Sequence, residues 1–176
     1  TGEDTLSLHD ALPISLLSDI HSNLPALEAV LREVKSGGAE DIVFLGDIVG
    51  YGAHSAECVK WARLLSGQIA IGNHDAALRV FGTPGYEPPQ TNWRRDDYAC
   101  GLMHSVKSLS REDMDWLLAQ PYSFGIPGAI VAHASLDDPH FFNYIEDQES
   151  ADPSLDLLAK QSNPVGFFGH THIQKV

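Results

Sequence analysis

The sequence predicts an α/β domain built on parallel strands. Short apolar runs, each about as long as a buried strand, alternate with segments of helical periodicity, and turn residues separate them. Strand, helix and strand in this order form βαβ units, which place consecutive strands in parallel. Polar residues directly follow the runs, so we expect a binding site beyond the carboxyl ends of the strands.

Five apolar runs are predicted to be strands. They are rich in β-branched or aromatic residues and lack a clean polar alternation, which is typical of strands buried on both faces. Each is bounded by polar, glycine or proline residues. The runs are Ile14–Leu17, Asp41–Leu45, Gln68–Ile71, Ala129–Ala132 and Val165–Phe168.

Helices are predicted between and after these runs. In the first, from Pro25 to about Lys35, apolar residues at i, i+3, i+4 and i+7 form one stripe: Leu27, Val30, Leu31 and Val34. A Gly/Pro-rich loop is expected at 82–92 and an irregular polar segment at 134–152. Further helices are expected from about Ser55 to Leu65, from about Thr91 to Ser108, after Ser110, and near Pro153–Lys160.

Composition limits the classes of function. The 176 residues suit one domain, and 11 Lys and Arg against 24 Asp and Glu give a net charge of −13. This balance argues against non-specific binding to nucleic acid or to an anionic membrane. No apolar stretch approaches the roughly 18 residues of a membrane span. Cys58 and Cys100 form no C-x-x-C pair, so we expect reduced thiols and a cytoplasmic location.

The two ends of the sequence lead to two further predictions. Residues 5–14 read TLSLHDALPI, which matches one translated frame of a common short-read sequencing adapter. We therefore expect residues 1–14 to be a non-native extension and residues 15–176 to be the domain. Val176 follows closely on a motif-rich segment, so the domain is expected to lack its C-terminal strands.

Side chains that bind metals follow all five apolar runs. Five of the nine histidines lie in these segments, together with carboxylates and one amide. This mixture suits a first-row divalent metal rather than calcium or a thiolate zinc site. Seven candidates are too many for one ion, and Asp47 could bridge two ions about 3.5–4 Å apart, as in phosphate-ester hydrolysis. The seven are Asp19, His21, Asp47, Asn73, His133, His170 and His172.

The order and spacing of these motifs resemble the calcineurin-like metallophosphoesterases. The runs SDIHSNLPALEAVL and GDIVGYG are similar to the small prokaryotic phosphodiesterase branch of that family. The resemblance extends from about residue 15 to the end and implies a four-layer α/β/β/α sandwich. The motifs that carry it are Asp19-x-His21, Gly46-Asp47, Gly72-Asn73-His74-Asp75, the lone His133, and Gly169-His170-x-His172.

The resemblance also implies a role for each site residue. His74 would contact the phosphate and protonate the leaving group near pH 7, and Asp75 would orient His74. Mn is the expected metal, with Fe, Zn and Ni as alternatives. One ion would be held by Asp19, His21, Asp47 and His172, and the other by Asp47, Asn73, His133 and His170.

The implied activity is dimetal-dependent hydrolysis of phosphate esters by in-line attack of a metal-bridging hydroxide. Phosphodiesters are favoured, because residues 46–52 lack the Arg that the protein-phosphatase branch carries after Gly-Asp. The expected partner is a small phosphate ester or nucleotide-like substrate. The alternatives are a dinucleoside polyphosphate hydrolase, a phosphomonoesterase, and a non-catalytic scaffold of the same fold.

Several residues near the motifs allow two interpretations. His54 is either a substrate contact or a solvated loop residue. His140, Phe141, Phe142 and Tyr144 either line the substrate pocket or pack a loop. Trp93, Arg94 and Arg95 either reach the substrate from a lid or occupy a surface helix.

Overall fold

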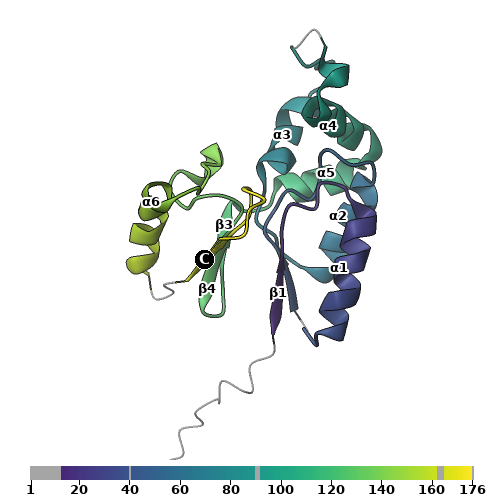
Figure 1. Ribbon diagram of the computed structural model, residues 1–176. Coiled ribbons are helices and arrows are strands. Elements are labelled where there is room, and N and C mark those ends of the chain that lie inside the picture. The colour runs from purple at the N-terminus through teal and green to yellow at the C-terminus, as the bar shows by residue number, and fades with distance from the viewer. Residues whose placement is uncertain (1–12, 40, 90–91, 162–164, 176) are drawn as a thin grey trace, which may run out of the picture.

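The computed structural model describes residues 13–39, 41–89, 92–161 and 165–175. Two small sheets face each other, and helices cover their outer faces (Figure 1). The layers run from helix α6 through the sheet of β3, β4 and β5 to the sheet of β1 and β2, and then to helices α1 and α2. The expected four-layer α/β/β/α arrangement is confirmed.

The first sheet pairs β1 (Ile14–Leu17) with β2 (Asp41–Phe44) in parallel, with Ile14 opposite Asp41. Helix α1 (Leu24–Ser36) connects them, as the βαβ pattern predicts. β1 begins at Ile14, so this residue belongs to the sheet although it ends the expected N-terminal extension. Residues 1–12 of that extension lie outside the described residues.

The predicted strand at 68–71 is wrong. Ile69, Ala70 and Ile71 are fully buried, but only Ala70 N–H donates to a neighbouring strand, at 3.0 Å to Phe44 O. The next amide, Ile71 N–H, donates instead to Pro121 O at 2.8 Å. The apolar pattern therefore predicted burial correctly. It did not predict that this segment lacks the regular backbone hydrogen bonds that define a strand.

The second sheet is mixed. β3 (Ser123–Ile126) and β4 (Ala129–Ala132) form an antiparallel hairpin, and β5 (Gly166–Phe168) pairs with β4 in parallel. β3 was not predicted, because its sequence SFGI has weak apolar character and contains a glycine. Pairing with the wholly buried β4 nevertheless holds it in the sheet.

Helix α6 (Gln148–Ala159) covers this second sheet and begins earlier than predicted. Asp147 caps it by accepting a hydrogen bond from Ser150 N at 2.9 Å. Pro153 therefore lies inside the helix rather than at its start. The predicted irregular segment is accordingly shorter at its C-terminal end.

Four other helices pack beside the first sheet. α3 was not predicted, and it begins within the Gly-Asn-His-Asp motif. The helix predicted from Thr91 starts later, because Asp96 caps it by accepting from the backbone N–H groups of Tyr98 and Ala99. These helices are α2 (Ser55–Leu65), α3 (Asn73–Phe81), α4 (Asp97–Ser108) and α5 (Arg111–Leu118); short 3₁₀ turns occupy Trp93–Arg95 and Pro139–Phe141.

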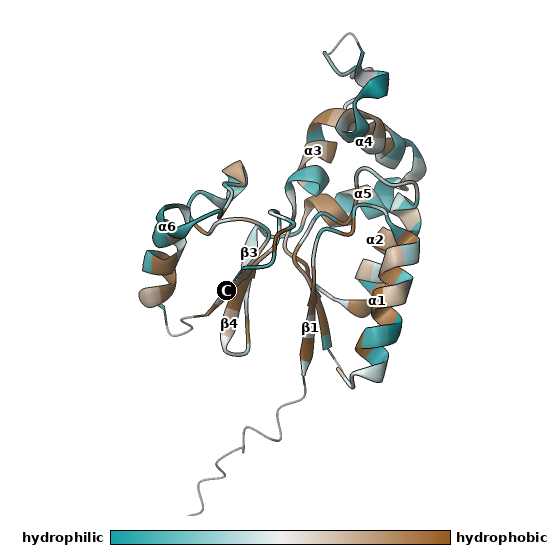
Figure 2. Cartoon of the chain, in the orientation of Figure 1, coloured by the Kyte–Doolittle hydropathy of each residue, from teal (hydrophilic) through white to brown (hydrophobic). Residues whose placement is uncertain are grey.

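The main core lies between the first sheet and these helices, where apolar residues of strands and helices meet (Figure 2). Phe44, Ile48 and Leu117 are completely buried there. Val30 departs from the predicted helical stripe, because it is 43% exposed while Leu27 is buried. In the described part of the chain, no helix is long and apolar enough to cross a bilayer.

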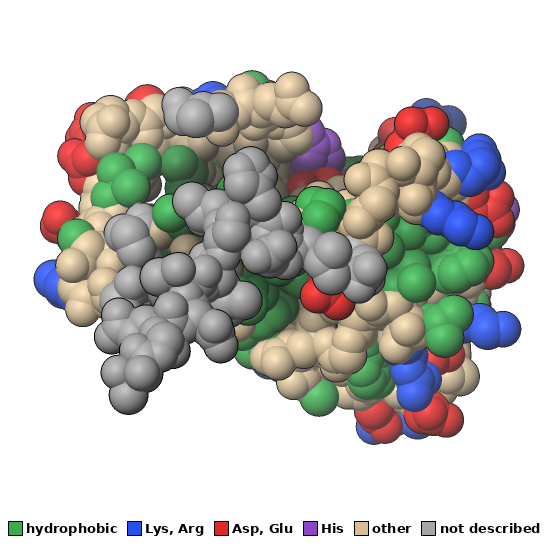
Figure 3. All heavy atoms as spheres, turned by 90° about the horizontal axis from the view of Figure 1, so that it is seen from below, with side chains coloured by type: hydrophobic (Ala, Val, Ile, Leu, Met, Phe, Trp, Pro, Cys, Tyr) green, Lys and Arg blue, Asp and Glu red, His purple; other side chains and the backbone are tan. Residues whose placement is uncertain are grey.

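Seen from below, Lys and Arg side chains lie scattered among Asp and Glu (Figure 3). This face carries no continuous basic patch among the described residues. That distribution agrees with the acidic composition. It does not provide, on this face, the cluster of basic residues that nucleic-acid binding requires.

Candidate metal centre

Loops that leave the carboxyl ends of the strands meet at one edge of both sheets. The loops after β1 and β2 run side by side, with Asp19 N–H donating to Gly46 O at 3.1 Å and His21 N–H to Asp47 O at 2.8 Å. The two sheets are linked at this edge, because His170 N–H donates to Asp19 Oδ2 at 3.1 Å. The fold thus assembles residues from both ends of the chain.

Most of the predicted ligands lie on unusual backbone. Asp19, His21, Asp47, His170 and His172 all have φ between 47° and 69°. This left-handed region is costly for residues other than glycine and is concentrated at functional sites. The surrounding hydrogen bonds therefore hold these residues in a conformation that their own preferences oppose.

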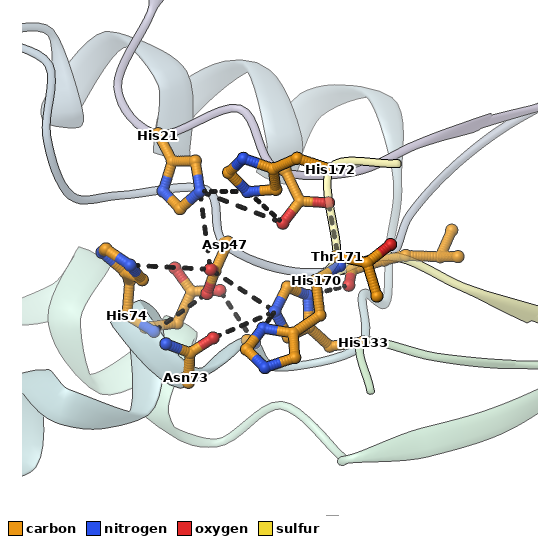
Figure 4. A network of polar contacts seen from close by, with 12 residues as sticks. His21, Asp47, Asn73, His74, His133, His170, Thr171 and His172 are labelled. Atoms are coloured by element: carbon orange, nitrogen blue, oxygen red, sulfur yellow. Dashed lines mark hydrogen bonds and ion pairs between the residues drawn. The ribbon is translucent and has the colours of Figure 1, made fainter. Parts of the chain in front are cut away.

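The first group of donors contains Asp19, His21 and His172 (Figure 4). His172 Nε2 lies 3.1 Å from His21 Nε2 and 3.2 Å from Asp19 Oδ1. His21 Nδ1 donates to the carbonyl of Val49 at 3.2 Å, so it carries the proton of the neutral ring. The Nε2 lone pair of His21 consequently faces the other possible metal ligands of this group.

The second group contains Asn73, His133 and His170. His133 Nε2 lies 3.1 Å from Asn73 Oδ1 and 3.2 Å from His170 Nδ1. Its Nδ1 donates to the carbonyl of Leu45 at 2.8 Å, which again leaves the Nε2 lone pair pointing inward. A backbone carbonyl thus fixes the orientation of one histidine in each group.

Asp47 lies between the two groups. Its Oδ2 is 3.6 Å from His21 Nε2 and 3.4 Å from His133 Nε2. Its Oδ1 accepts the backbone N–H of His74 at 2.9 Å, at the positive end of helix α3. The carboxylate is buried and is held so that a single oxygen faces both groups.

Burial and neighbouring charge set the protonation of the donors. Burial lowers the pKa of His21, and it also lowers the pKa of His170, beside His133. Burial alone would raise the pKa of Asp47, but His133, His74 and His21 together outweigh it and lower that pKa; burial opposes the charged form of His133, and the contact with Asp47 overcomes it and raises the pKa of His133. Neutral imidazoles and an ionised carboxylate are the forms that bind a metal.

The donor set fits two divalent cations. Lone pairs of nitrogen and oxygen face one another at close range, an arrangement that a cation between them would stabilise. Asp19 Oδ1 and His170 Nε2 are buried and have no hydrogen-bond partner. Imidazole, carboxylate and amide oxygen without thiolate suit a first-row metal. All seven residues proposed from the sequence lie together here, and His21, Asp47 and His74 form a third close group of possible ligands.

A family model agrees with this geometry. The model described as calcineurin-like phosphoesterase matches residues 12–174. The chain belongs to the calcineurin-like phosphoesterase family. The fold and the five linked motifs are those expected of that family.

The individual relatives described here are longer than this chain. An uncharacterised protein of Methanocaldococcus jannaschii, MJ0912, is 34% identical over 164 residues, which are 91% of this chain and 62% of that protein. A metallophosphoesterase from Sphaerobacter thermophilus is 33% identical with a TM-score of 0.73, covering 93% of this chain and 62% of that one. A protein solved as a candidate diadenosine tetraphosphatase is 26% identical with a TM-score of 0.51, covering 70% and 50%.

His74, the expected proton donor, is buried beside the donor groups. Burial lowers its pKa to about 4, so the ring is neutral at pH 7 in the metal-free chain. The ring lies against Tyr51, Tyr98 and His21, at centroid distances of 4.4–4.7 Å. Its Nε2 lies 3.9 Å from Asp47 Oδ2, while Nδ1 is buried without a hydrogen-bond partner.

The expected orienting contact from Asp75 to His74 is not among the hydrogen bonds of the described residues. Asp75 instead joins backbone segments, because Oδ1 accepts from Val49 N–H at 3.1 Å and Oδ2 from Gly72 N–H at 3.0 Å. Burial raises the pKa of this carboxyl to about 7. Asp75 therefore braces the loop that carries Asp47 against the start of α3.

A cavity of about 230 Å³ opens over the two groups of donors. Tyr51 was not singled out from the sequence, although it stands in the run GDIVGYG; Tyr144 was left open and does line this cavity. His54 lines an adjoining cavity. The 230 Å³ cavity is lined by His21, Asp47, Tyr51, Asn73, His74, Tyr144, His170, Thr171 and His172.

Proposed function

We propose that this protein hydrolyses phosphodiesters with the help of two divalent metal ions. The observation that carries the proposal is the position of Asp47, whose Oδ2 faces a donor group on each side. A shared carboxylate between two metal positions is the arrangement that two-metal phosphoesterases use. We further propose Mn as the working ion, with Fe, Zn and Ni as alternatives.

When bound, the two ions would polarise the phosphoryl oxygens and acidify a water molecule. The protein's own groups would place the substrate. With Nδ1 against Gly50 and Nε2 toward the cavity, a neutral His74 would donate its Nε2–H to a phosphoryl oxygen. Its role is then to bind and orient the phosphate, rather than to enter the reaction as an imidazolium.

Charge favours a diester over a monoester. None of the described residues that line the cavity or its neighbour is Lys or Arg. A monoester dianion carries one more charge than a diester, and nothing but the metals would balance it. A dinucleoside polyphosphate, the class named for one structural relative, carries still more charge. We therefore place the diester first and the polyphosphate second.

The test uses two chromogenic substrates with the same leaving group. The protein is assayed on bis(p-nitrophenyl) phosphate and on p-nitrophenyl phosphate, with Mn²⁺ and then with excess chelator. We expect diester turnover that the chelator abolishes. Asp47→Asn should lose at least about 100-fold in kcat/KM, while Asp41→Asn at the exposed start of β2 serves as the matched control.

Other results would support a different function. Faster turnover of the monoester would replace the proposal with a phosphomonoesterase. Two bound ions without turnover of either substrate, or of a dinucleoside polyphosphate, would favour the scaffold. Equal losses in Asp47→Asn and Asp41→Asn would contradict the role given to Asp47.

A further inference from the structure

Tyr51 forms one wall of the cavity over the metal centre. Its ring is 50% exposed, although it stands edge-on to His21 at a centroid distance of 4.8 Å. Its backbone is left-handed, with φ of 40°, and helix α4 packs closely on it at Gly101. A side chain at Gly101 would collide with the backbone of Tyr51. The exposed ring therefore stands on a rigidly held segment.

Tyr144, from the second half of the chain, lines the same cavity. Its ring stacks on the ring of His170, with centroids 3.8 Å apart and planes inclined by 23°. It is nevertheless 54% exposed. Two half-exposed tyrosines thus line one cavity, each resting on a histidine of a different donor group.

Space for a substituent lies next to Tyr51. A second cavity of about 560 Å³ shares Tyr51, His21 and His172 with the first and continues past Ala53 and His54. A phosphate held over Asp47 would place its ester group beside Tyr51 and Tyr144 in the first cavity, and the second cavity would leave room for the remainder of a larger group. The two cavities together accommodate a group larger than the phosphate itself.

The chemistry of the walls defines that group. Aromatic faces bind flat rings by stacking, and this contact tolerates many ring types. The described residues lining both cavities include no Lys or Arg, so nothing there would balance a second anionic group. The walls therefore suit a flat, uncharged ring rather than a further phosphate or a carboxylate.

We propose that Tyr51 and Tyr144 form an aromatic clamp that binds a flat, uncharged ring in the ester group of the substrate. The proposal rests on the proposed function, which places the phosphate on the metal centre. It narrows the substrate to esters that carry one phosphate beside an aromatic or heteroaromatic group. It assigns a binding role to two residues outside the metal ligands.

Binding of stable analogues tests the clamp without turnover. Calorimetry on the Mn²⁺-loaded protein compares phenylphosphonate with methylphosphonate and cyclohexylphosphonate. We expect phenylphosphonate to bind about tenfold more tightly than methylphosphonate, with cyclohexylphosphonate between them. The preference should fall toward onefold in Tyr51→Ala and Tyr144→Ala and should persist in Tyr51→Phe and Tyr144→Phe.

Phe141→Ala is the matched control, because Phe141 is an aromatic residue, 68% exposed, that lines neither cavity. It should keep the full preference. Equal affinities for the three phosphonates in the unaltered protein, or an unchanged preference in both alanine variants, would overturn the clamp while leaving metal-dependent diester hydrolysis standing. If the metal-loaded protein bound no phosphonate and turned over no diester, the proposed function would fail, and the clamp with it.

Discussion

The Nε2 atoms of His21 and His172 lie 3.1 Å apart, although 151 residues separate them along the chain. His21 follows the first strand and His172 follows the last, so the candidate centre draws on both sheets. His21 Nε2 carries a lone pair, because Nδ1 of the same ring donates to the carbonyl of Val49. A cation at this position would join the two halves of the fold.

Metal binding should therefore stabilise the fold. At a free Mn²⁺ concentration about 100 times the dissociation constant, the gain is about 2.7 kcal/mol, which corresponds to a rise in Tm of about 5–10 °C. Differential scanning calorimetry with Mn²⁺ and with chelator measures it. His172→Ala should lose most of the rise, and His140→Ala, an exposed histidine outside the donor groups, should keep it. An equal rise in both variants would argue against the site.

Gly72 is expected to tolerate no side chain. A Cβ there would collide with the carboxylate and the backbone nitrogen of Asp47. Gly72→Ala should therefore displace Asp47 and weaken Mn²⁺ binding at least about tenfold, which equilibrium dialysis would show. Gly67→Ala is the control, because a Cβ at Gly67 meets nothing within 4 Å. Undiminished binding in Gly72→Ala would refute this account of Asp47.

Three buried serine hydroxyls form a chain beside the centre. Ser105 donates to Gly101 O at 2.8 Å, so it accepts from Ser55 at 2.9 Å, which in turn accepts from Ser22 at 2.8 Å. Ser55→Ala removes the acceptor of Ser22 and should lower the free energy of unfolding by about 1–3 kcal/mol in urea titrations. Ser108→Ala, at an exposed hydroxyl, should change it by less than about 0.5 kcal/mol. Similar losses in the two variants would contradict the chain.

The raised pKa of Asp75 gives the metal-free protein a specific pH dependence. Because burial raises that pKa from 3.8 to about 7, the folded state binds a proton that the unfolded state has released between these values. The contribution of Asp75 to stability is therefore full below pH 3.8 and is lost as the pH rises to about 7, with a slope of at most about 1.4 kcal/mol per pH unit.

Comparison with Asp75→Asn isolates this effect, since the amide does not titrate. In chelator-treated protein, the stability advantage of the unaltered chain over the variant should shrink from pH 4 to pH 7 and then stay constant. Urea titrations at several pH values measure it. A constant advantage from about pH 5 to pH 7 would contradict the raised pKa, because it would mean that Asp75 is ionised throughout this range.

The sequence predicted the strands whose apolar runs pair with a neighbouring strand, and the helices whose apolar residues lie on one face. β1, β2, β4 and β5 were found from such runs, and α1 and α2 from helical spacing and turn residues. The run at Gln68–Ile71 was misread because burial and strand pairing give the same apolar signal. β3 was missed for the opposite reason, since SFGI owes its place to its hairpin partner.

The candidate metal ligands could be found from the sequence because they stand close behind apolar runs, where strand ends meet. The environment of each of these side chains could not be predicted from the sequence. The residues next to His74 in the sequence do not indicate that Tyr98 from α4 packs against its ring, or that burial lowers the pKa of His74. Likewise, the groups that donate hydrogen bonds to Asp75 are the backbone N–H groups of Val49 and Gly72, and no residue type in the sequence predicts such contacts.

Anomalous X-ray diffraction from crystals grown with Mn²⁺ tests the central claim most directly, because it locates each ion independently of activity. We predict two peaks about 3.5–4 Å apart, one on either side of Asp47 Oδ2. One should lie within bonding distance of His21 and His172, and the other within bonding distance of His133. A single peak, or peaks that leave Asp47 without a metal neighbour, would contradict the account.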